Sequence, residues 1–314
     1  MIKMKFDNRI IWVVIASVGL YGVFLFFSDF NIISKQISNF KYEFLPLILL
    51  LVSISWTPLL IRWQILLKKN HINIPIKKSF LLFLGGMSMT ITPGHVGELI
   101  KSQLIKTIYN IPRTKTAPII FVEKFYDLTG AIIASIIGII ILGMDASLIL
   151  ISVSILIVII FLIYYRPIFE FILKRVTKTK FFSKYSENIS DSYEIVRNST
   201  TPQISSISFG LSILYWIIIS VAVHFILLSF GIESISILKT ISIYSSSVII
   251  GAISFIPGGL GITEGSLIGL FSLEGIDISL ALVLSVMIRI LTMWYSVSIG
   301  FICLKFTGGL SSSK

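Results

Sequence analysis

The sequence contains little charge for its length. Asp, Glu, Lys and Arg together make up 13% of the 314 residues, whereas hydrophobic residues make up 55%. Soluble domains usually contain roughly 25% charged residues. The composition therefore excludes an ordinary soluble enzyme and predicts a membrane protein whose main solvent is lipid.

Cysteine and histidine are also scarce, and common catalytic motifs are missing. Cys303 is the single cysteine, which excludes an intramolecular disulfide and a cysteine-based metal cluster. The three histidines are dispersed along the chain, so a zinc site is not expected. No G-x-S-x-G, H-E-x-x-H or Walker A pattern occurs. We therefore expect no metal, no cofactor and no familiar hydrolytic or ATP-driven chemistry.

Long apolar segments occupy most of the chain. A spanning helix needs about 20 mostly apolar residues. Six uninterrupted candidates cover residues 10–27, 44–67, 116–142, 147–165, 204–230 and 278–304. The first is longer than the apolar core of a signal peptide and has no small-x-small cleavage site after it. We therefore interpret it as a retained span.

Two further apolar regions, 79–105 and 237–271, are interrupted by proline and glycine. We interpret each as a re-entrant helical hairpin that returns to the side from which it entered. Of the 26 basic residues, 20 then fall on one side, in the segments 1–9, 68–78, 101–115, 166–197 and 305–314. This positive-inside pattern predicts cytoplasmic N- and C-termini, and it explains the basic charge without a nucleic-acid partner. The alternative is that each broken region forms two short full spans.

The predicted fold is therefore an all-α polytopic membrane helix bundle, with about six spans and two oppositely oriented re-entrant hairpins. It forms a single membrane domain over 1–314. Each hairpin lies between two spans, which gives an inverted repeat at 44–142 and 204–304, joined by a cytoplasmic connector at 166–203. Paired Gly/Pro interruptions in corresponding halves point to a transporter's binding site near the bilayer midplane.

The two interruptions share a pattern, P-G-x-x-G followed by glutamate. Backbone that is not helical is tolerated at membrane depth only inside protein or against a water-filled cavity, so both breaks are predicted to line a cavity. The helix that starts at each break favours an anion such as phosphate at its N-terminus. A simple packing kink is the alternative. The candidate residues are Pro93, Gly94, His95, Gly97 and Glu98 in the first break, and Pro257, Gly258, Gly259, Gly261 and Glu264 in the second.

Further charged residues lie inside apolar segments, where an unpaired charge is costly. Glu123 and Asp127 share one face of a helix, and Lys124 lies on a different face. Arg289, near the middle of the last span, is the natural partner for one of the buried carboxylates. We expect either a polar track that binds a headgroup or ion pairs that only fix the helix register.

Other polar residues are interpreted as structural. Arg62 and Trp63 lie near the cytoplasmic end of a span, where snorkelling and an aromatic belt explain both. His224 is interpreted as a structural residue.

Three stretches carry a family resemblance: PGHVGELIKSQLI from Pro93, VEKFYDL around Glu123, and FIPGGLGITEGSLIGLF from Phe255. The sequence resembles the flippase-like membrane family related to the transmembrane region of lysylphosphatidylglycerol synthase, and the match covers nearly the whole chain. That family typically shows a G-E pair, then E-R-x-x-D, then P-G-G-x-G-x-x-E. Here Lys124 replaces the usual arginine, which keeps the charge but loses bidentate phosphate binding, and His95 replaces a small residue.

The resemblance implies movement of a lipid between leaflets, either an aminoacylated phospholipid or a polyprenyl-linked sugar. Better-known relatives carry an additional soluble aminoacyl-transferring domain, and we expect this chain to be like the stand-alone members. The expected partner is a membrane lipid, and the sequence does not distinguish a monomer from a homo-oligomer. Two rival functions stay open: a lipid-modifying enzyme that uses Glu123 and Asp127 with a metal, and a small-solute or ion transporter.

Overall fold

A computed structural model describes residues 38–92, 97–141 and 189–307, with a few single residues between 154 and 175. The predicted spans 10–27 and 147–165 lie outside the described residues, as do most of the connector and Pro93, Gly94 and His95. The fold is therefore described from the two predicted repeats.

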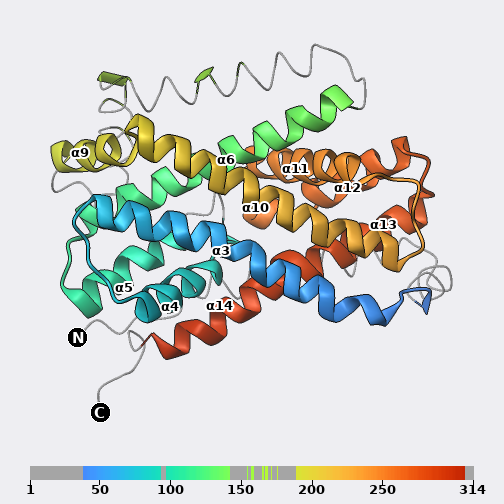
Figure 1. Cartoon of the computed structure of the whole chain (residues 1–314), viewed down its shortest axis with the longest axis horizontal. Helices are drawn as coiled ribbons and strands as arrows, with labels where there is room; N and C mark the ends of the chain where they lie inside the picture. Colours follow the sequence, from blue (N-terminus) through green and yellow to red (C-terminus); the bar gives the residue numbers. More distant parts are fainter. Residues whose placement is uncertain are drawn as a thin grey trace.

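The regular elements of these ranges are all helical, as predicted (Figure 1). The longer helices are α3 (Leu45–Lys69), α4 (Ile76–Met87), α5 (Ile100–Tyr109), α6 (Arg113–Ile141), α9 (Ile189–Ser199), α10 (Pro202–Ser229), α11 (Ile237–Ile253), α12 (Ile262–Leu273), α13 (Ile278–Arg289) and α14 (Tyr295–Phe306). Two 3-10 turns, η1 (Tyr42–Phe44) and η4 (Pro257–Gly259), and a π-helical segment, η5 (Ile290–Trp294), complete the set.

Three segments in the described ranges are long and apolar enough to cross a bilayer: Tyr42–Lys69, Pro202–Ser229 and Ile278–Phe306. Each contains 28 or 29 residues. At about 1.5 Å per residue they are about 42 Å long, which exceeds the roughly 30 Å hydrocarbon core. Each coincides with a span predicted from the sequence, and α6 covers most of a fourth predicted span. The chain is a multi-pass membrane protein.

Both predicted interruptions divide their segment into two shorter helices. The first separates α4 from α5, and the second separates α11 from α12 through the turn η4. The two helices pack against each other in both cases. Figure 1 shows the α4–α5 pair toward one end of the long axis and the α11–α12 pair toward the other end. The two helix pairs thus lie toward opposite ends of the described bundle.

Helix packing in one half corresponds to helix packing in the other. Helix α3 packs against α10, and the contact of α6 with α11 has its counterpart in the contact of α14 with α4. The contact between α5 and α6 likewise corresponds to the contact between α12 and α13. The contact between α3 and α6 corresponds to the contact between α10 and α13. Exchanging the two halves therefore reproduces these helix contacts, whereas the contacts of α9 with α3 and α6 have no counterpart.

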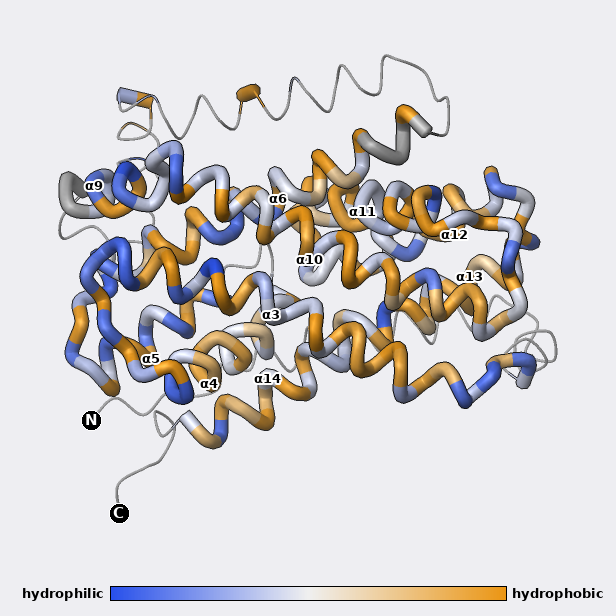
Figure 2. The backbone as a smooth tube through the Cα atoms, in the orientation of Figure 1, coloured by the Kyte–Doolittle hydropathy of each residue, from blue (hydrophilic) through white to orange (hydrophobic). Residues whose placement is uncertain are grey.

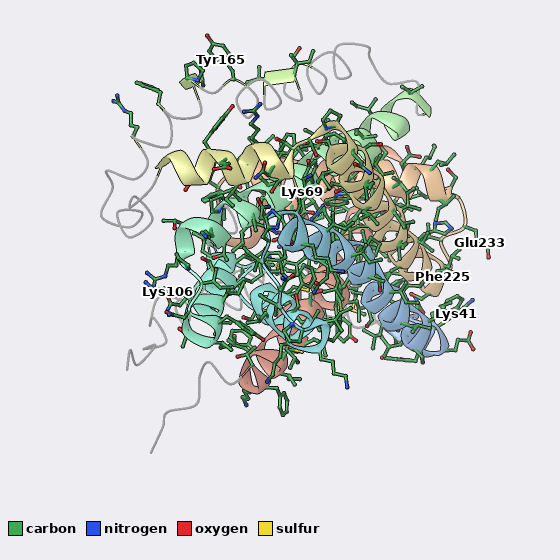
Figure 3. All side chains as sticks on the ribbon, turned by 60° about the vertical axis from the view of Figure 1, so that its left-hand side comes forward. Lys41, Lys69, Lys106, Tyr165, Phe225 and Glu233 are labelled. Atoms are coloured by element: carbon green, nitrogen blue, oxygen red, sulfur yellow. The ribbon has the colours of Figure 1, made fainter. Side chains whose placement is uncertain are left out.

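Hydrogen bonds at both ends of α3 fix its direction against α10. Lys41 N donates to Ser229 O over 2.9 Å at one end, and Asn70 Nδ2 donates to Ser199 Oγ over 2.8 Å at the other. The two helices are therefore antiparallel. Figure 3 shows Lys106 on one side of the molecule, Lys41 with Glu233 on the other side, and Lys69 between them. Figure 2 shows hydrophilic segments gathered at the ends of the helices, with hydrophobic stretches between them.

Local sequence explains where several helices begin and end. Asp277 Oδ1 accepts a hydrogen bond from Ser279 N over 2.9 Å and caps the start of α13. Pro202 is the first residue of α10, where its missing N–H is not needed. Asn110 adopts a left-handed conformation, with φ 54°, directly after α5, which ends that helix.

Glycine permits the close approach of α14 to α4. A Cβ atom on Gly300 would lie 2.5 Å from the backbone N of Ser88 and 2.7 Å from the carbonyl O of Leu84. Neither neighbour is a flexible side chain, so an added methyl group would push the two helices apart. The contact therefore depends on glycine at this position.

We predict that Gly300→Ala lowers the free energy of unfolding by about 1–3 kcal/mol, the usual cost of overpacking. Thermal unfolding of the protein in detergent measures the effect. Gly210→Ala is the matched control, because nothing lies within 4 Å of a Cβ atom at this position in α10. The control should be neutral or stabilising. Equal melting temperatures for the two variants would contradict the prediction.

Candidate functional site

A cavity of about 360 Å³ lies between the two halves of the bundle. Its volume falls in the range of small-molecule binding sites. The lining comes from α3, α4, α6, α10 and α11, from both breaks, and from the last span. The predicted site residues among the lining are Glu98, Glu123, Lys124, Asp127, Gly258, Gly259 and Arg289.

The other predicted site residues have different positions. Glu264 is buried and contacts Arg289, although it does not itself line the cavity. Gly97 and Gly261 adjoin the glutamates of their breaks, and Pro257 begins η4. Pro93, Gly94 and His95 lie outside the described residues. The structure thus gathers the charged candidates of both halves around one space.

Six charged side chains of the first half form an alternating row of ion pairs. In order they are Arg62, Asp127, Lys124, Glu98, Lys101 and Glu123. The successive N–O distances are 2.5, 3.2, 2.6, 3.3 and 2.7 Å. The row joins α3, the start of α5 and α6, so these helices are held together where hydrocarbon would otherwise penalise each charge.

Lys101 is a site residue that the sequence analysis missed. The positive-inside count assigns it to a cytoplasmic segment, but the structure buries it between Glu98 and Glu123. Its ammonium group also lies 4.9 Å from the centre of the Trp63 ring, within cation–π range. Gly86 makes room for it, because a Cβ atom there would lie 2.6 Å from Lys101 Cγ. The glutamate three residues earlier was the available signal for this inward-facing lysine.

The snorkelling interpretation of Arg62 is wrong. Arg62 is 1% exposed, and its guanidinium donates to Asp127 Oδ1 on α6 and to Ser212 Oγ on α10. The arginine therefore connects three helices rather than reaching toward the membrane surface. The position of Arg62 near the end of an apolar segment did not reveal these contacts. Whether a side chain faces inward depends on the rotation of the helix about its axis.

The second break has its own ion pair. Arg289 Nε donates to Glu264 Oε1 over 2.9 Å, which confirms the expected partnership of Arg289 with a buried carboxylate. Glu264 Oε2 accepts from the backbone N–H of Gly261 over 2.7 Å, so the same carboxylate caps α12. Arg289 also donates to the carbonyl O of Gly258. The pair therefore satisfies backbone groups that the break leaves open.

Glycine is required in the second break for conformational reasons. Gly258, Gly259 and Gly261 have φ of 60°, 64° and 80°, a region that other residues rarely occupy. In addition, a Cβ atom on Gly259 would lie 3.1 Å from Gly251 Cα on α11. The break is thus a compact turn packed against the helix that precedes it.

The two breaks present the same kind of pair to the cavity. In the first, Glu98 at the start of α5 contacts Lys124 on the following long helix, α6. In the second, Glu264 in the first turn of α12 contacts Arg289 at the end of α13, directly before the π-helical segment η5. A π-helical turn is frequent at functional sites. Each half therefore supplies one glutamate at a break and one cation opposite it.

Most charged side chains of the two ion-pair clusters are buried, but those of Lys124 and Asp127 are partly exposed. The side chains of Lys124 and Asp127 are 31% and 19% exposed, whereas the other charged side chains of the two clusters are at most 7% exposed. A molecule in the cavity would thus meet one accessible cation and one accessible anion. The remaining pairs hold these two in position.

The histidines and possible metal ligands add little to the site. His224 Nδ1 lies 3.2 Å from Thr240 Oγ1, between α10 and α11, in agreement with its expected structural role. Within the ranges that the structure describes, no group of three or more His, Cys, Asp or Glu is arranged to hold a metal ion. The carboxylates at the cavity instead contact lysine and arginine.

The amino-acid sequence of this chain matches a known protein family. Residues 13–300 match the family described as lysylphosphatidylglycerol synthase TM region. The chain belongs to this family. The match includes both breaks, both ion-pair clusters and all helices from α3 to α13. The resemblance drawn from the three sequence stretches is thereby confirmed.

Proteins similar to this chain share the same general description. A UPF0104 membrane protein of Pyrococcus horikoshii is 25% identical, and the alignment covers 91% of this chain and 94% of that protein. Two UPF0104 membrane proteins of Methanothermobacter thermautotrophicus are 30% and 32% identical over 104 and 94 residues. These shorter matches span only 30% and 28% of the length of the respective relative.

We predict that Lys101→Met lowers the free energy of unfolding by about 3–5 kcal/mol, because it leaves Glu123 charged and buried without its cation. Adding Glu123→Gln to the same chain should recover part of the loss. Lys239→Met is the control, since its pair with Glu274 is partly exposed and should contribute only about 0–1 kcal/mol. Unfolding in detergent measures all three. If the losses in unfolding free energy caused by Lys101→Met and Glu123→Gln simply add in the double variant, the proposed coupling of Lys101 with Glu123 is contradicted.

Proposed function

We propose that this protein moves a polar-headed lipid between the two leaflets of the membrane, as a flippase or scramblase. The observation that carries the proposal is the cavity between the halves, which residues of both breaks line and beside which each half places a glutamate–cation pair. Charged groups inside a membrane protein usually mark a pathway for a polar substrate. Membership of a family named after a phospholipid synthase supports a lipid as that substrate.

We further propose the predicted architecture of about six spans with two re-entrant hairpins that enter from opposite sides, and cytoplasmic termini. Three observations support it: the short helices on either side of each break, the location of the two pairs toward opposite ends, and the matching helix contacts of the halves. In inverted-repeat transporters the substrate site lies where such broken helices meet. The cavity occupies that position.

The accessible charges suggest how a headgroup would bind. Lys124 would attract phosphate, while Asp127 would accept a hydrogen bond from an ammonium or hydroxyl group. An aminoacyl phospholipid offers phosphate with an amine, and a polyprenyl-linked sugar offers phosphate with hydroxyls. Both classes fit this combination. A lysine at 124 binds phosphate as a point charge rather than through a bidentate fork.

The two rival functions receive less support from the contacts. An enzyme that uses Glu123 and Asp127 together would need both carboxylates directed at one reacting group. Instead Glu123 contacts Lys101, and Asp127 contacts Arg62 and Lys124. A small-ion transporter would need mainly polar walls, whereas Trp56, Phe83, Met87 and other apolar side chains contribute much of this lining.

We predict that Glu98→Gln and Glu264→Gln each reduce lipid transfer at least about ten-fold, because each change removes the negative charge that pairs with a cation of the cavity lining, Lys124 or Arg289. The assay follows the exposure of fluorescent phosphatidylglycerol and phosphatidylethanolamine in vesicles that contain the reconstituted full chain. Unchanged transfer by both variants would contradict the proposed role of the pairs.

Glu274→Gln is the matched control for this assay. Glu274 contacts Lys239 over 2.6 Å beyond the end of α12, and neither residue lines the cavity. The control variant removes a carboxylate from an ion pair without touching the site, so its transfer rate should equal that of the wild type. The folded fraction of each variant is measured by size-exclusion chromatography before reconstitution.

A further inference from the structure

One part of the cavity lining is exposed at the surface of the protein. Among the lining residues that the structure describes, the exposed ones are Ala252, Phe255 and Ile256. Phe255 is 73% exposed and Ile256 is 39% exposed. All three lie at the end of α11 or in the loop that leads to η4. We call these three residues the lip, since the cavity reaches the surface beside them.

The surface around the lip is apolar. Ile250 and Ile253, on the last turns of α11, are 46% and 54% exposed. The 17 residues of α11 extend about 25 Å from its start, so the lip lies deep along the bundle rather than at its end. An exposed apolar surface at this depth in a membrane protein faces hydrocarbon. In the architecture proposed above, the lip would therefore connect the cavity to lipid and not to water.

Phe255 is held in an unusual conformation. Its φ of 54° lies in the left-handed region, which is strained for a bulky residue that is not glycine. The backbone on both sides is nevertheless fixed, because Phe255 N donates to Ala252 O over 3.3 Å and Ile256 N donates to Ser254 Oγ over 3.2 Å. Strain of this kind persists where the surrounding structure enforces it, frequently at functional sites.

The same loop also reaches the charged part of the cavity. Two residues after Ile256, the carbonyl O of Gly258 accepts a hydrogen bond from Arg289. The cavity wall thus changes from exposed and apolar at the lip to charged at Arg289 within a few residues. The lining also includes the accessible Lys124 and Asp127. This division matches an amphipathic molecule with its polar part inside and its apolar part at the lip.

We propose that the lip is the lateral opening at which the hydrocarbon chain of a lipid remains in the bilayer while its headgroup occupies the charged part of the cavity. This inference rests on the proposed function and adds where the lipid enters and how it is oriented. The occupant is the hydrocarbon chain of a lipid, because the lip offers only apolar contacts and faces hydrocarbon.

A reversible block of the lip tests this proposal. Cys303 is first replaced in a Cys303→Ser chain, so that an introduced thiol is the single one. Phe255→Cys in this chain is reconstituted into vesicles of phosphatidylethanolamine and phosphatidylglycerol and labelled with a bulky apolar methanethiosulfonate. We expect labelling to slow the transfer of long-chain fluorescent lipid at least about five-fold, and dithiothreitol to restore it.

Ile253→Cys in the Cys303→Ser chain is the matched control. Ile253 is exposed at the end of α11, two residues before Phe255, but it does not line the cavity. Its labelling should leave transfer unchanged. The proposal is overturned if labelled Phe255→Cys transfers lipid at the unlabelled rate, or if labelling at 253 slows transfer equally. It is also overturned if position 255 does not react because a second copy of the chain covers it. Absence of transfer by the unlabelled wild type would instead contradict the proposed function itself.

Discussion

The ion pair of Lys124 with Glu98 joins the first break to the long helix α6 at the cavity wall, and the pair of Arg289 with Glu264 makes the matching connection in the second half. A charge placed in hydrocarbon is costly, and a charge that loses its partner inside protein is costly as well. These helices must therefore approach one another at fixed depth and rotation. The position of the breaks, the cavity and the helix packing all depend on that requirement.

The ion pairs and the broken helices belong to one arrangement. A break leaves backbone N–H and C=O groups without helical partners, and in the second half the same two side chains satisfy both the backbone and each other. Glycine with positive φ allows the turn to be tight enough for this contact. The structure thus opens a polar space inside an apolar bundle without leaving these groups unpaired.

The arrangement of exposed and buried charge also gives the cavity a direction. Lys124 and Asp127 are accessible, and the side chains behind them are buried in pairs that hold helices together. Apolar residues at the end of α11 form another part of the wall, which reaches the surface. A space with accessible charge in one part of its wall and exposed apolar residues in another fits the lipid that we propose as substrate. The family to which the chain belongs is consistent with that choice of substrate.

Hydropathy and the two Pro-Gly patterns were sufficient to predict an all-α membrane bundle, the described long helices and the locations of both breaks. Burial of Glu98, Glu123 and Glu264 and the partnership of Arg289 also followed from the sequence, because charge in an apolar segment must find a partner. Which cation meets which carboxylate was decided only by tertiary structure. Arg62 and Lys101 were assigned to the membrane surface or to a loop, yet both pair with carboxylates on α6. Hydropathy reports how apolar a segment is. It does not report the rotation and depth of each helix, and these determine which side chains meet.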